Sequence, residues 1–82
     1  MPIISRFYGI AIKMYFREHG IPHFHAAYGD YNAVFALDTL DLIEGRLPRR
    51  AESLVREWAA QHQAELLEMW ATQTFRQLRG LE

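Results

Sequence analysis

The sequence predicts an α+β fold, in which a four-stranded antiparallel meander is covered on one face by a C-terminal amphipathic helix or helix pair. Two observations lead to this prediction. Apolar residues alternate with polar ones before Gly45, as they do in strands, and recur at helical spacing after it. The chain has 82 residues, which is enough for one hydrophobic core, so residues 1–82 are expected to form a single domain.

The first strand is expected at about residues 6–17, where the sequence reads RFYGIAIKMYFR. Side chains along a strand alternate between two sides. The side expected to face the core carries Tyr8, Ile10, Ile12, Met14 and Phe16, and the other side carries Phe7, Gly9, Ala11, Lys13, Tyr15 and Arg17. The loop from Glu18 to Pro22 then returns the chain antiparallel. Pairing Phe16 with Phe24 is the expected register, and it gives two neighbour pairs on the outer side, Tyr15 with His25 and Arg17 with His23.

The next two strands are expected at about residues 23–28 and 31–37. They flank Gly29-Asp30, which suits a two-residue hairpin loop because glycine tolerates a positive φ. Pairing Tyr28 with Tyr31 gives opposed pairs on each face: Phe24 with Phe35 and Ala26 with Ala33 towards the core, and His23 with Ala36 and His25 with Val34 away from it. Both imidazoles are therefore expected on the face that the helix does not cover.

A short fourth strand is expected at about residues 40–44, with Leu40 and Leu42 towards the core. The acidic residues around it lack the spacing and glycine of a calcium loop, so Asp38, Asp41 and Glu44 are interpreted as turn and outer-face residues.

The helical region is expected from about residue 48 to residue 72. Pro48 suits the first turn, and the apolar stripe includes Trp58 and Trp70, which we interpret as core anchors. The polar segment Gln61-His62-Gln63 leaves open a break into two helices. For the tail that follows, two alternatives remain: Phe75 and Leu78 extend the helix, or the chain frays near Gly80.

Composition narrows the class of protein. Half of the residues are hydrophobic, and cysteine is absent, which excludes disulfides and thiolate zinc sites. We expect a cytoplasmic protein, because the N-terminus does not read as a signal peptide and no apolar run is long enough to cross a bilayer. The net charge of −1 argues against nucleic-acid binding by global electrostatics.

His23 and His25 form a candidate metal pair, because strand residues at i and i+2 project from the same face. Glu18 and His19 could complete a site for zinc or another divalent transition metal. An open coordination position would then permit metal-activated water chemistry, which makes a metal-dependent enzyme one alternative. The other interpretation is that the histidines contact Tyr15, backbone groups or a partner. Covalent hydrolase chemistry is not expected, because cysteine is absent and neither Ser5 nor Ser53 lies in a nucleophile setting. Whether the chain is an enzyme of another kind stays open.

Arg46, Arg49 and Arg50 crowd the start of the expected helix and are candidates for anion binding, including RNA. The alternative is that they are solvated or paired with acids such as Glu52. Nucleic acid is therefore a partner that the sequence permits without favouring.

Several segments together resemble a family of small bacterial proteins known as domain of unknown function 4160. They are RFYGI (6–10), MYF (14–16), PHFHA (22–26), GRLPRRA (45–51) and VREWAAQHQAELLEMW (55–70). The resemblance covers about residues 2 to 70 and implies no reaction. It does imply a stand-alone short protein, in a gene layout similar to toxin–antitoxin pairs.

Function is expected to reside on the bare face of the sheet, which carries Tyr15, Arg17, His23 and His25. A mixed aromatic, basic and imidazole surface of this kind is commonly a contact surface. We therefore expect a small interaction module that forms a homo-oligomer or binds a small protein partner.

Overall fold

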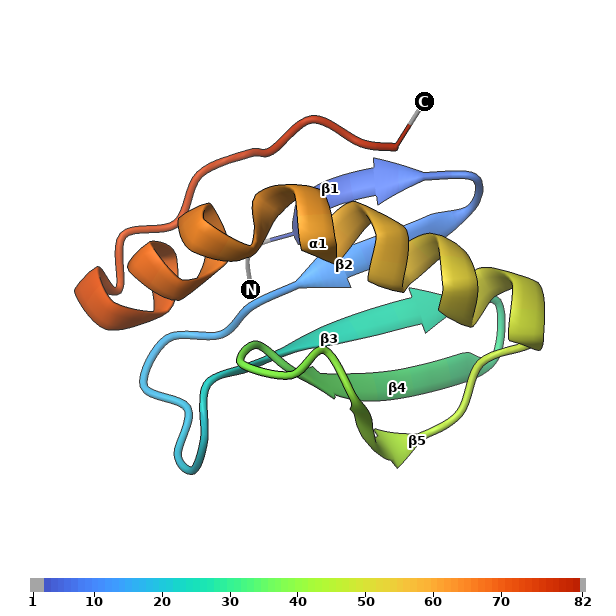
Figure 1. Cartoon of the computed structure of the whole chain (residues 1–82), viewed down its shortest axis with the longest axis horizontal. Helices are drawn as coiled ribbons and strands as arrows, with labels where there is room; N and C mark the ends of the chain where they lie inside the picture. The colour runs from blue at the N-terminus through green and yellow to red at the C-terminus, as the bar shows by residue number, and fades with distance from the viewer. Residues whose placement is uncertain (1–2, 82) are drawn as a thin grey trace.

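The computed structural model describes residues 3–81, and it confirms the α+β class with an antiparallel sheet and one C-terminal helix (Figure 1). The sheet has five strands in the order β1-β2-β3-β4-β5, not the four that were predicted. The elements are β1 Ile3–Phe7, β2 Ile10–Lys13, β3 His23–Tyr28, β4 Tyr31–Ala36, β5 Leu42–Gly45 and α1 Arg49–Thr72. No helix among these described residues is both long and apolar enough to cross a membrane.

The additional strand arises because the expected strand at 6–17 is interrupted by a tight turn. Tyr8 and Gly9 have φ values of 49° and 81°, which suit the two-residue hairpin loop that joins β1 to β2. Phe7 pairs directly with Ile10, and directly opposed residues share a face. The prediction that Phe7 faces outward was therefore wrong: it is buried and stacks on Trp58, while Tyr8 is 59% exposed.

The strand also ends earlier than expected. β2 stops at Lys13, so Tyr15, Phe16 and Arg17 lie in the loop, and the Phe16 side chain is 58% exposed instead of buried. The predicted pairing of Phe16 with Phe24 is wrong by two residues, because Lys13 pairs with His25. A shift of two residues preserves the faces of a strand, so Ile10 and Ile12 still point into the core.

The β3–β4 hairpin has the predicted register throughout, from the pair His23 and Ala36 to the pair Tyr28 and Tyr31. Gly29 has a φ of 58°, as its loop position requires. β5 is shifted to residues 42–45, because Leu40 has a φ of 64° and lies in the preceding turn. Leu40 and Leu42 nevertheless pack against the core, as expected.

A single unbroken helix covers the inner face of the sheet (Figure 1). Gln63 does not break it, because its side-chain amide donates hydrogen bonds to the carbonyls of Leu37 and Asp38 at 2.7 and 2.9 Å. Trp58 is fully buried, as expected for a core anchor, and packs against Phe24, which stacks on Phe35.

The tail neither extends the helix nor frays. Gln73 ends α1 in the left-handed conformation, and the chain then runs back towards β1. The Leu78 N–H donates to the Ile4 carbonyl at 2.7 Å, and the Trp58 indole N–H donates to the Arg79 carbonyl at 2.8 Å. The tail thus covers the β1 edge of the sheet, where unpaired backbone groups would otherwise remain.

Candidate functional site

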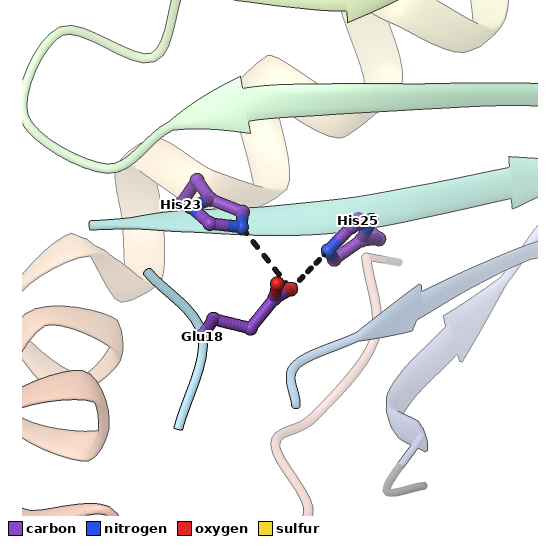
Figure 2. Close-up of side chains that lie close together, drawn as sticks. All are labelled: Glu18, His23 and His25. Atoms are coloured by element: carbon purple, nitrogen blue, oxygen red, sulfur yellow. Dashed lines mark hydrogen bonds and ion pairs between the residues drawn. The ribbon is translucent and has the colours of Figure 1, made fainter. Parts of the chain in front are cut away.

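Glu18, His23 and His25 converge at the start of β3 (Figure 2). The two histidines come from alternate positions of the strand, and Glu18 reaches them from the β2–β3 loop. One carboxylate oxygen, Oε1 of Glu18, lies 3.1 Å from His23 Nε2 and 2.5 Å from His25 Nε2. The donor atoms of the three residues lie within 4.8 Å of one another. Within residues 3–81, no other set of three His, Asp or Glu side chains is close enough to share a metal ion.

His23 is the most constrained member of the group. Its Nδ1 lies 2.8 Å from the Ile21 carbonyl, and its ring centre lies 5.0 Å from that of Trp70 on α1. Both rings were expected on the face that the helix does not cover. His25 lines the hollow on that face, whereas the His23 side chain is only 11% exposed and lies against the end of α1. Contact with the end of the helix therefore fixes the His23 ring.

His25 lies closer to solvent, with a side chain that is 30% exposed. The Tyr15 ring meets it edge to face at 4.7 Å between ring centres, so these two residues are neighbours as predicted, although Tyr15 lies outside the strand. His25 thus presents one ring edge to Glu18 and borders the outer face of the sheet.

The electrostatics of the group are centred on Glu18. Partial burial raises the pKa of its carboxyl, but the hydrogen bonds and charges of His25 and His23 outweigh that effect. The net result is a pKa below the ordinary value, so Glu18 is an anion at neutral pH. The site therefore combines a carboxylate with two imidazoles, which is a donor set that divalent transition metals accept.

Two other predicted site residues lie outside this group. His19 is exposed and is not part of the set of close donor atoms. Arg17 was expected beside His23, but it occupies a turn with a φ of 60°, and its backbone N–H donates to Gln73 Oε1 at 2.8 Å. The loop conformation, which sequence periodicity does not encode, separates both side chains from the site.

A straight row of side chains crosses the outer face of the sheet. Lys13 pairs with His25, His25 with Val34, and Val34 with Glu44, so one residue from each of four adjacent strands lies in line. These four, together with Tyr15, Ala27 and Asn32 among others, line a hollow of about 280 Å³. Lys13 and Glu44 were both predicted on the outer face, but their alignment was not predicted, because it depends on three separate registers.

The three arginines lie at the opposite end of the sheet, around the connection from β5 to α1 (Figure 1). All three are exposed. The Arg46 guanidinium lies over the Tyr31 ring at 5.5 Å, and its backbone N–H donates to the Asn32 carbonyl. Arg46 is thus engaged with the hairpin, and the structure separates these arginines from the histidines.

Comparisons with curated proteins and with solved structures found no match. A comparison with family models did find one. The model described as a domain of unknown function, DUF4160, matches residues 9–71, a segment that runs from the first hairpin turn almost to the end of α1 and includes Glu18, His23 and His25. The chain therefore belongs to the DUF4160 family.

Proposed function

We propose that this protein is a small interaction module, and that the outer face of its sheet binds a second copy of the chain. The row Lys13–His25–Val34–Glu44 is the observation that supports the proposal. The inner face is covered by α1, whereas the outer face carries this row around a shallow hollow. A domain this small gains stability by burying such a face against a partner.

Charge favours a second copy as the partner. The row has a cation at one end and an anion at the other, and neighbouring strands are about 4.8 Å apart, so the two ends are separated by about 14 Å. A two-fold axis that reverses the row places Lys13 of each copy opposite Glu44 of the other. The surface is thus complementary to itself, and the same contact occurs twice in a dimer.

Charge reversal provides the test. Size-exclusion chromatography with light scattering is expected to give twice the monomer mass for the wild type. Lys13→Glu and Glu44→Lys should each give monomers, because each places like charges opposite one another. Glu57→Lys, an exposed reversal on α1, is the matched control and should remain dimeric.

Restoration of the dimer makes the test specific. The double variant Lys13→Glu/Glu44→Lys should dimerise again, and an equimolar mixture of the two single variants should give a heterodimer. A wild type that is monomeric at all accessible concentrations, or single variants that stay dimeric, would refute the proposed interface.

The resemblance to stand-alone members of the family supports a narrower proposal, which is participation in a toxin–antitoxin-like pair in the bacterial cytoplasm. The lack of cysteine is in keeping with that compartment. Co-expression with the product of the neighbouring gene tests it: a stable complex is expected, and the absence of partner uptake counts against it. RNA binding through Arg46, Arg49 and Arg50 is the rival, and it requires salt-dependent RNA retention that falls when these arginines are replaced.

A further inference from the structure

We infer that Glu18, His23 and His25 form a binding site for a divalent first-row transition metal ion, which the chain holds through one carboxylate oxygen and two imidazole nitrogens. This inference goes beyond the interaction surface and does not depend on it. It rests on the hydrogen bonds of His23, on the spacing of three donor atoms and on the contrast with the second histidine–glutamate cluster of the chain.

The hydrogen bonds of His23 direct its Nε2 at Glu18. The Ile21 carbonyl can only accept a hydrogen bond, so His23 Nδ1 carries a hydrogen. A neutral imidazole then has a lone pair at Nε2, and that lone pair faces the Glu18 carboxylate at 3.1 Å. Nε2 is therefore the ring nitrogen that remains available to bind a metal ion.

The contact with Ile21 is also the support that metal-binding histidines use. Such histidines usually donate their other ring N–H to a carbonyl or a carboxylate, which fixes the tautomer and the ring orientation. The ring of His23 is held in addition by Trp70, which lies against it. Its Nε2 is therefore directed at Glu18 before any ion arrives.

The spacing of the donor atoms fits a shared ion. Donors about 2.1 Å from a metal, at angles between octahedral and tetrahedral values, lie about 3.0–3.4 Å apart. Glu18 Oε1 already lies 3.1 Å from one imidazole nitrogen and 2.5 Å from the other. All three donor atoms lie within 4.8 Å of one another. To share an ion the shorter contact must lengthen, and Glu18 lies on a loop, where its side chain can rotate.

The second histidine–glutamate cluster, His62 with Glu65, offers too few ligands to hold a metal ion. His62 Nδ1 lies 2.8 Å from Glu65 Oε1, and the other oxygen of Glu65 accepts a hydrogen bond from Arg76 at 2.6 Å. One imidazole and a carboxylate already paired with a guanidinium offer a metal too few ligands. Within residues 3–81, a histidine–glutamate contact thus occurs in two places, but three such ligands converge only at Glu18.

Three protein ligands leave at least one coordination position for water or a substrate, as in catalytic zinc sites. His25, one of the three ligands, also lines the hollow on the outer face, together with Tyr15 and Lys13. The site therefore belongs to the open class of metal centres and not to the closed structural class.

Titration of untagged protein with Co²⁺ and with Zn²⁺ tests the inference. We expect one ion per chain, a Co²⁺ visible spectrum from mixed nitrogen and oxygen ligands, and a Tm that rises by several degrees with Zn²⁺. His23→Ala/His25→Ala should weaken binding by at least roughly 100-fold, since even supporting residues of metal sites contribute 10–100-fold. Glu18→Gln should weaken it by a smaller factor.

Two controls make the result specific. His62→Ala removes the histidine of the other cluster, and His19→Ala removes the exposed histidine next to Glu18; both should bind metal like the wild type. The charge-exchanged variant Lys13→Glu/Glu44→Lys should also bind metal, which separates this site from the proposed dimer surface. Lack of stoichiometric binding by the folded wild type, or equal binding by folded His23→Ala/His25→Ala, would overturn the assignment.

Discussion

The two faces of the sheet are built by alternate residues of the same strands, and they have opposite characters. On β3, Phe24 and Ala26 are buried beneath α1, while His23 and His25, which alternate with them, meet Glu18. The inner face is a continuous apolar surface closed by Trp58. Packing against the helix thus uses alternate residues of each strand, which leaves the others free to carry charged and imidazole side chains.

The largest effect should come from the inner face. Trp58→Ala removes a fully buried ring that packs against Phe7 and Phe24, and it also leaves the Arg79 carbonyl without the indole donor at that point. We expect the free energy of unfolding to fall by about 3–5 kcal/mol. Trp70→Ala, at the half-buried tryptophan beside His23, is the control. If urea unfolding shows equal losses for both, the assignment of Trp58 as the central anchor is wrong.

An intermediate effect should come from Gly45, at the end of the strand that carries Glu44. A Cβ there would lie 2.1 Å from the Asn32 carbonyl oxygen, and φ is 75°. Gly45→Ala should therefore displace β5 and reduce stability by about 2 kcal/mol or more. Gly20→Ala is matched in φ, at 93°, but has no atom within 4 Å, so about 1 kcal/mol is expected. Similar losses in chemical denaturation would show that the close approach of β5 to β4 is not limiting.

The smallest effect should come from the outer face, and it should depend on pH. The folded pKa of Glu18 is lowered, because the hydrogen bonds from His25 and His23 outweigh the burial that raises it. Its contribution is therefore complete above the unfolded pKa of about 4.3 and is lost as the pH falls through the folded value. We expect a contribution below about 1 kcal/mol in chelator-treated protein, measured as the pH dependence of unfolding.

Glu18→Gln should remove this acid-dependent part of the stability. The pKa of Glu65 is also lowered, chiefly by its hydrogen bond with His62 and further by Arg76, so Glu65→Gln should remove a separate part. If Glu18→Gln left the acid limb of the stability profile unchanged, the Glu18–histidine contacts would not be stabilising in solution.

The sequence predicted some elements closely and others poorly. The β3–β4 hairpin was predicted residue by residue, because Gly29-Asp30 marks a two-residue loop and the flanking strands alternate. The β1–β2 hairpin was missed, although Gly9 within an alternating run is the signal that could have revealed it. Tyr-Gly is a less familiar loop pair, and alternation continues across the turn, so the pattern alone reads as one long strand.

The candidate site, like the fold, was predicted from the sequence only in part. Placing His23 and His25 on one face required only the two-residue period of a strand, and Glu18, one of the two loop candidates, lies close enough to both imidazoles to share an ion with them. His19 lies outside this group, because the loop directs Glu18, and not His19, towards the strand. The role of the Ile21 carbonyl could not be predicted, because backbone contacts in an irregular loop leave no mark on side-chain pattern.

The amino-acid sequence by itself determined the fold class, the central hairpin, the extent of the helix and the shared direction of two imidazoles, since each depends on the spacing of neighbouring residues. Only the tertiary structure decided that one Glu18 oxygen meets both rings, that Lys13 and Glu44 stand in one row, and that the tail returns to β1. These features depend on strand registers and loop paths, which are fixed by contacts between residues distant in the chain.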